Sequence, residues 1–223
     1  RDWSSDVCSS DLLHRAQNIG CAGRAAMIDV LYIDCCIRGE QSRTRKLAEA
    51  FLSALSRRGD CKIERLILMD EPLVPLVAGF FWQREQLLAE GALEHPRFRY
   101  ARRFARADRI VIAAPFWDLS FPALLKVYIE NLCVQGITFD CDAQSGTYGI
   151  CRAKKMLFLT TRGGALEGSP LDNGTKYLAD MAAFFGIPQF THVAADGLDL
   201  GLEPVETILE AAVERAEAVC VEF

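Results

Sequence analysis

Short apolar runs alternate along the chain with stretches in which apolar residues recur every three or four positions. Buried strands are predicted at 28–33, 109–114, 155–161 and 190–195, with a more polar strand nearer a sheet edge at 61–68. Helical spacing covers 42–59, a stretch up to about 106 that is interrupted near Pro96, and 123–132, 171–185 and 204–221. The turn-rich segment 139–151 predicts a small hairpin.

Strands that alternate with helices predict an α/β fold, since a parallel strand needs a long crossover to reach its neighbour. We expect a doubly wound, five-stranded parallel sheet in a three-layer α/β/α sandwich. Neither a repeat nor a linker divides residues 27–223, which we therefore interpret as one domain.

Residues 1–26 do not fit this pattern. The first twelve read RDWSSDVCSSDL and resemble the translation of a sequencing-library adapter, so we interpret 1–26 as a non-native or disordered leader and Met27 as the start of the protein. A genuine disordered tail is the alternative. A secretory signal is excluded, because the segment lacks a basic start followed by an apolar core.

Net charge and residue counts disfavour several classes of partner and site. The net charge of −5 over 223 residues does not favour nucleic acid or an anionic membrane as partner, and no apolar stretch is long enough to span a bilayer. The nine cysteines form no C-x-x-C pair and the three histidines complete no zinc spacing. We therefore expect free thiols in a reducing cytoplasm and no metal site.

Three loops follow predicted central strands, at 36–44, 116–119 and 161–164. In a doubly wound sheet these loops converge on one crevice at the carboxyl ends of the strands. The first leads into a helix N-terminus, where Ser42 and Thr44 add hydroxyls and Arg38 and Arg43 add positive charge. Such a site favours a phosphate, and neither dinucleotide nor P-loop glycine spacing is present. Capping of the helix by Ser42 beside two solvated arginines explains the same residues.

The other two loops are each ambiguous when taken alone. Phe116 and Trp117 offer surfaces for an aromatic ligand, or are ordinary packing residues. Gly163 and Gly164 allow a flat ligand to approach the backbone, or form a plain tight turn. Only the conjunction of the three loops indicates a ligand site.

Several motifs together resemble the flavodoxin-like NAD(P)H-dependent oxidoreductases, most closely the FMN-dependent NADH-azoreductase and quinone-reductase group. They are APFWDLSFPALLKVYI at 114–129, GITF at 136–139, Lys154-Lys155 and TRGG at 161–164, and the resemblance runs from Met27 to about Phe223. In that family the segment after the third strand reads like P-M-Y-N-F and the one after the fourth like S-R-G-G.

The resemblance implies a flavodoxin-like fold, FMN as cofactor and NADH or NADPH as electron donor. The flavin would carry hydride by ping-pong transfer to a quinone, an azo compound or a similar flat acceptor, with no catalytic side chain. Family members are typically homodimers with the flavin near the interface, and Phe80, Phe81 and Trp82 are candidates to reach the neighbouring subunit. The implied cofactor-binding residues are Cys36, Ser42, Arg43 and Thr44 at the phosphate, Pro115, Phe116, Trp117, Asp118 and Leu119 along the ring and ribityl chain, and Thr161, Arg162, Gly163 and Gly164 at the pyrimidine side.

Two departures and two alternatives bear on this interpretation. Cys36 stands where serine is usual in many members of the family, and we interpret it as a small loop residue without a redox role. Trp117-Asp118 replaces the family's Tyr-Asn, and an acidic side chain beside the flavin would disfavour a negatively charged reduced ring. A low-molecular-weight phosphatase is disfavoured, because its Cys-x5-Arg spacing fails here: six residues separate Cys36 from Arg43. A non-catalytic flavodoxin-like electron carrier is the alternative from another class, although such carriers are usually shorter than this chain.

Overall fold

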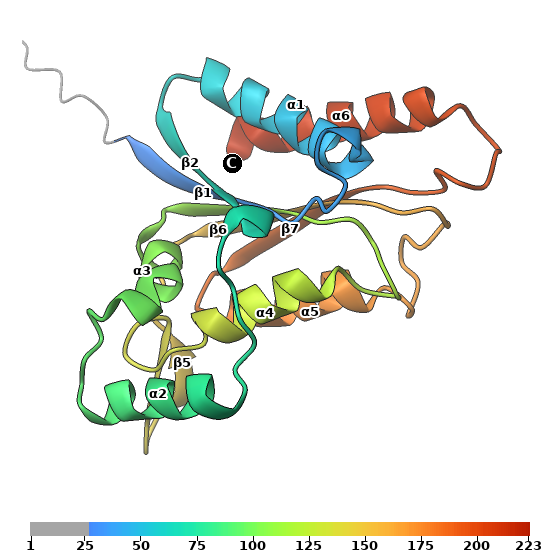
Figure 1. Ribbon diagram of the computed structural model, residues 1–223. Coiled ribbons are helices and arrows are strands. Elements are labelled where there is room, and N and C mark those ends of the chain that lie inside the picture. Colours follow the sequence, from blue (N-terminus) through green and yellow to red (C-terminus); the bar gives the residue numbers. More distant parts are fainter. Residues whose placement is uncertain (1–26) are drawn as a thin grey trace, which may run out of the picture.

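The computed structural model describes residues 27–223, so the interpretation of 1–26 lies outside the described residues. A parallel sheet of five strands crosses the molecule in the order β2-β1-β3-β6-β7 (Figure 1). The strands are β1 (Ile28–Asp34), β2 (Cys61–Ile67), β3 (Arg109–Ala113), β6 (Lys155–Thr161) and β7 (Gln189–Ala195). The predicted fold class and all five predicted strands are confirmed, and the polar strand β2 does lie at an edge.

Helices cover both faces of this sheet. In Figure 1, α1 and α6 lie above it and α3, α4 and α5 below it. The α-helices are α1 (Arg43–Arg57), α2 (Ala78–Ala89), α3 (Arg99–Arg106), α4 (Ala123–Leu132), α5 (Asn173–Phe184) and α6 (Val205–Glu222). Short 3-10 turns occupy Gly39–Gln41, Leu68–Asp70 and Pro96–Phe98, and Pro96 interrupts the helical stretch where predicted. Of the described helices, none combines the length and apolar character needed to cross a membrane.

The alternation of side chains along each strand divides the core between the two faces. Leu31 and Ile33 of β1 pack towards α3, α4 and α5, while Val30 and Tyr32 pack towards α1 and α6. Because both faces are covered, β1, β3 and β6 are apolar almost throughout, as expected for central parallel strands.

Local chemistry sets the ends of α5. The helix begins at Asn173, two residues later than the pattern predicts, because the Asp172 carboxylate caps it by accepting from the Thr175 N–H at 3.0 Å. It is closed by Gly186, as predicted. A β-carbon at Gly186 would lie 2.7 Å from the carbonyl oxygen of Gly149, so the backbone of the hairpin can approach the helix end only without one.

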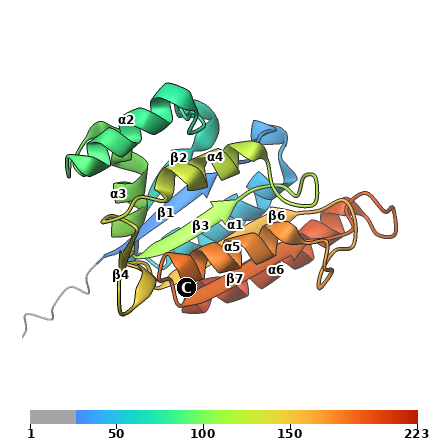
Figure 2. The same cartoon turned by 90° about the horizontal axis from the view of Figure 1, so that it is seen from below.

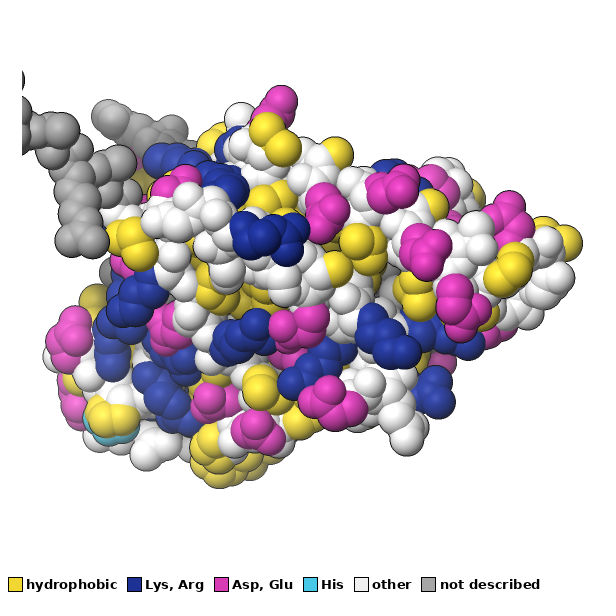
Figure 3. All heavy atoms as spheres, turned by 90° about the horizontal axis from the view of Figure 1, so that it is seen from above, with side chains coloured by type: hydrophobic (Ala, Val, Ile, Leu, Met, Phe, Trp, Pro, Cys, Tyr) yellow, Lys and Arg dark blue, Asp and Glu magenta, His cyan; other side chains and the backbone are white. Residues whose placement is uncertain are grey.

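Two elements project from the sandwich on the α3 side (Figure 2). The predicted hairpin is formed by β4 (Phe139–Asp142) and β5 (Gly146–Gly149). Helix α2 rests on a small cluster built around Phe98, Ala101 and Val134, and none of its own side chains is fully buried. The opposite face of the molecule, over α1 and α6, carries basic and acidic side chains interspersed with apolar ones (Figure 3).

Candidate functional site

Strands β1, β3 and β6 are neighbours in the sheet, so the three loops singled out in the sequence leave the same edge. Hydrogen bonds join the loops to one another. The Thr44 and Thr161 hydroxyls lie 2.6 Å apart in a buried position, and the Phe116 N–H donates to the Thr161 carbonyl at 3.1 Å. The predicted convergence is therefore present.

The first loop presents the N-terminus of α1. Ser42 is buried, and its hydroxyl oxygen accepts from the Arg45 N–H at 3.2 Å, as the capping interpretation requires. The cap uses only a lone pair of the hydroxyl oxygen, so capping does not exclude donation by the hydroxyl to an anion. The N–H groups of Arg43 and Thr44, the first two of the helix, have no hydrogen-bond partner among the described residues. A phosphate suits such a terminus.

Cys36 lies at the start of this loop and is fully buried. Its N–H donates to the Asp34 carboxylate at 2.8 Å, and its Sγ lies 3.7 Å from the Ala113 carbonyl. Burial, with the nearby Asp34 charge, raises the pKa of the Cys36 thiol well above its usual range. A neutral thiol is a small loop residue and not the thiolate nucleophile that a phosphatase needs.

The second loop is a tight turn that starts after Pro115 and Phe116. Trp117 and Ser120 exchange two backbone hydrogen bonds, of 3.1 and 2.7 Å. Between them Asp118 and Leu119 both have positive φ angles, of 49° and 62°. Aspartate tolerates this conformation, whereas leucine adopts it at a cost of about 1 kcal/mol. Strained backbone of this kind is concentrated at ligand sites.

The side chains of this turn are largely open to solvent. Trp117, Asp118 and Leu119 are exposed, and Phe116 is half-buried with its ring 5.8 Å from the Arg162 guanidinium carbon. Core packing therefore does not explain Trp117, and the turn presents its indole and the Asp118 carboxylate to solvent at this edge of the sheet.

Arg162 of the third loop is only 1% exposed. Its guanidinium pairs with Asp172 and, at 3.2 Å, with Asp196, and donates to the Thr175 hydroxyl at 2.9 Å. Glu167 lies 3.5 Å away. Because these groups pair with both terminal nitrogens and the side chain is buried, the loop can offer a ligand its backbone but not the Arg162 charge.

The two glycines of this loop have different surroundings. A β-carbon on Gly163 would lie 2.5 Å from the Asp199 Oδ2, so Gly163 makes room for that carboxylate. A β-carbon on Gly164 would meet only Leu166, at 4.0 Å. Gly164 thus has the open backbone that a flat ligand could approach.

A fourth segment, Asp196 to Asp199, completes the site and was missed in the sequence. The N–H groups of Leu198, Asp199 and Gly197 donate to the carbonyls of Arg162, Gly163 and Gly164 at 3.0–3.1 Å. The Asp199 carboxylate also pairs with Arg43, with Oδ1 2.7 Å from Nη1. An Asp-Gly-x-Asp loop after the last strand, at the same sheet edge, is the signal that could have identified it.

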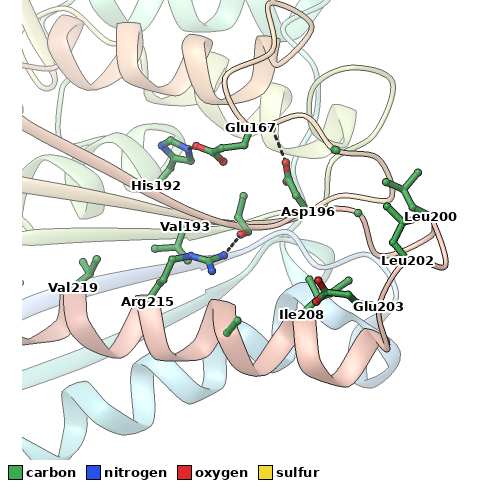
Figure 4. Close-up of a pocket in the computed structure, with 14 residues that line it drawn as sticks. Glu167, His192, Val193, Asp196, Leu200, Leu202, Glu203, Ile208, Arg215 and Val219 are labelled. Carbon is green, nitrogen blue, oxygen red and sulfur yellow. Dashed lines mark hydrogen bonds and ion pairs between the residues drawn. The ribbon is translucent and has the colours of Figure 1, made fainter.

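A cavity lies outside β7 and beside α6, and Asp196 and Gly197 of the fourth segment form part of its wall (Figure 4). It measures about 700 Å³ and has a mainly apolar wall, with Glu167 and His192 paired at 3.1 Å on one side and Arg215 donating to the Ala194 carbonyl at 2.7 Å on the other. His192 of β7 thus lies within hydrogen-bonding distance of Glu167, in the segment after the third loop. The remaining lining residues are Ala165, Val193, Leu200, Leu202, Glu203, Ile208, Ala211 and Val219.

The strand order and the loops at one sheet edge define a flavodoxin-like protein. Residues 29–219 match the family model described as flavodoxin-like fold, and the chain belongs to this family. It is 38% identical over 202 residues to FMN-dependent NADH:quinone oxidoreductase 2 of Clostridium acetobutylicum, and that match covers 88% of this chain and 100% of the relative. A 36% identical relative from Clostridium perfringens, an FMN-dependent NADH:quinone oxidoreductase, is matched over the same shares. Among solved structures, the azoreductase of Bacillus anthracis is similar with a TM-score of 0.78, at 28% identity, over 88% of this chain and 100% of the other.

Proposed function

We propose that this protein is an FMN-dependent NAD(P)H oxidoreductase that reduces quinones, azo compounds or similar flat electrophiles. The observation that carries the proposal is the convergence of the three loops: an open helix N-terminus and two further loops, joined by the Thr44–Thr161 and Phe116–Thr161 hydrogen bonds. The names of the relatives, quinone oxidoreductases and an azoreductase, supply the class of reaction.

The residues of the site suit both the phosphate and the aromatic ring of FMN. The free N–H groups of Arg43 and Thr44 and the hydroxyl of Ser42 are donors suited to a phosphate, which accepts hydrogen bonds and carries negative charge. At the other end, the open backbone at Gly164 and the exposed Trp117 indole suit a flat aromatic ring. We propose the same role for Cys36, Pro115, Phe116, Asp118, Leu119, Thr161, Arg162 and Gly163 as lining and supporting residues of this site.

When bound, FMN would supply the hydride chemistry, taken from NADH or NADPH and given to the acceptor in a ping-pong sequence. The chain itself binds and orients. The Thr44–Thr161 pair fixes the distance between the phosphate end and the third loop, and the buried ion pairs of Arg162 hold that loop in place. No side chain of the site needs to act as nucleophile or metal ligand.

We propose further that the protein is a homodimer whose contact surface includes α2. Phe80, Phe81 and Trp82 are all exposed there, and Val77 extends the apolar patch. Exposed apolar clusters of this kind mark protein contacts. A cytoplasmic location is proposed from the cysteines, since Cys35, Cys36, Cys61, Cys133, Cys141, Cys151 and Cys220 are all free thiols in the described part of the chain.

An absorbance spectrum of the purified protein with FMN, before and after anaerobic addition of NADH, tests the function. Bound oxidised flavin that bleaches and is reoxidised by a quinone is the expected result. Flavin that binds but does not bleach with either NADH or NADPH would favour the electron carrier. A folded protein that binds no FMN would contradict the cofactor assignment.

A further inference from the structure

Asp199 joins two sides of the crevice that the sequence places far apart. Its backbone N–H donates to the Gly163 carbonyl at 3.0 Å, which fixes it against the third loop. Its carboxylate then reaches the first loop, where Oδ1 lies 2.7 Å from the Nη1 of Arg43. Gly163 has no side chain at the point where the other oxygen lies. The position of this carboxylate is therefore built into the fold.

Two of the arginines around the N-terminus of α1 are already paired with carboxylates of the protein. Arg45 lies 3.0 Å from Glu40 and 3.7 Å from the buried Asp34, and Arg43 is taken by Asp199. Of the three arginines near the N-terminus, Arg38 alone has no carboxylate partner among the described residues. The phosphate of FMN carries up to two negative charges, and it would meet a terminus at which Arg43 is already paired with a carboxylate.

We propose that Asp199 is a specificity-determining residue of the flavin site, which restrains the contribution of the flavin phosphate to binding by competing for Arg43. The inference rests on the proposed function. A phosphate at the N–H groups of Arg43 and Thr44 must share the Arg43 guanidinium with Asp199, which holds one of its nitrogens, and it also experiences repulsion from that carboxylate. Riboflavin has no phosphate, so its binding neither draws on the Arg43 guanidinium nor is opposed by the Asp199 carboxylate.

The affinities of apo protein for FMN and riboflavin, measured by quenching of flavin fluorescence at low ionic strength, test this. Asp199→Asn keeps the backbone bond and the side-chain shape but removes the charge. We expect the substitution to increase the affinity for FMN by roughly two- to five-fold and to leave the affinity for riboflavin unchanged. The range is what an ion pair with side chains 36% and 68% accessible contributes. The gain is expected to shrink at high salt.

Asp180→Asn is the matched control, because the Asp180 side chain is about as accessible as that of Asp199 (65% and 68%) and pairs with Lys176 within α5, at 2.6 Å. It removes the same charge and is expected to change neither affinity. Weaker or unchanged FMN binding by Asp199→Asn would overturn the inference, as would an equal change for both flavins, which would show only a structural role. Wild-type protein that binds neither flavin would overturn the proposed function as well.

Discussion

Helices α1 and α2 are both rich in apolar residues, yet they have opposite relations to the rest of the molecule. α1 buries six side chains, whereas α2 buries none, and its Trp82 is 69% exposed. The difference lies in spacing. Leu47, Phe51 and Leu55 recur every four residues and fall on one face, while Phe80, Phe81 and Trp82 are consecutive and point in three directions. Apolar content alone therefore does not predict burial, and a consecutive aromatic run indicates a surface that needs a second partner.

Truncating one aromatic side chain on each helix gives the largest expected contrast. Phe51 is fully buried with its ring 5.4 Å from that of Phe223, so Phe51→Ala should lower the free energy of unfolding by about 3–5 kcal/mol. Phe81→Ala should change it by about 0.5 kcal/mol or less. Urea unfolding at a protein concentration low enough for monomer to dominate measures both. Similar losses in the two variants would break the comparison.

Substitution of Arg162 tests how much its buried ion pairs contribute to the stability of the fold. Arg162→Gln leaves Asp172 and Asp196 without their buried cation. We expect the free energy of unfolding to fall by about 3 kcal/mol, because removing one partner of a buried ion pair leaves the other charge without compensation. Thermal unfolding measures this loss, and Lys176→Gln, at an exposed pair, serves as its control. An equal effect of the two substitutions would show that the Arg162 network contributes no more than a surface pair.

For α2 the expected effect is on assembly. Trp82→Ser should shift the protein from dimer towards monomer in sedimentation velocity with little change in helix content, because the indole is exposed in the isolated chain. Leu202→Ser, which alters an exposed apolar side chain beyond β7, should leave the sedimentation coefficient unchanged. A wild-type monomer, or loss of the dimer in both variants, would contradict a specific α2 interface.

The smallest effect concerns thiols. Burial raises the pKa of Cys35 to about 12, whereas Cys141 on the hairpin is exposed. At pH 8, iodoacetamide should label Cys141 within minutes and Cys35 only after unfolding, as read by peptide mass spectrometry. Because the folded pKa is raised, this thiol stabilises the fold below about pH 9 and the contribution is lost as pH rises towards 12. Rapid labelling of Cys35 in the folded protein would contradict its burial.

The periodicity of the sequence predicted the strands, the helices and the sandwich, because burial on two faces leaves a direct pattern of apolar residues. It also brought the three loops together, since parallel strands must end at one edge. It did not predict where the Arg162 guanidinium points or why Gly163 is small. Both depend on Asp196 and Asp199, which lie more than thirty residues further along the chain and contact the third loop because β7 pairs with β6.

The contact between residues 197–199 and the third loop also bears on the order in which the site is completed during synthesis. The carbonyls of Arg162, Gly163 and Gly164 gain their hydrogen bonds from residues 197–199, close to the carboxyl end. A ribosome delivers the chain from the amino end, so the first and second loops emerge well before the segment that orders the third. A nascent chain that ends before β7 has no complete crevice. At the proposed flavin site, cofactor binding would then wait until synthesis is nearly finished, because a chain that ends before β7 lacks the residues that hold the third loop.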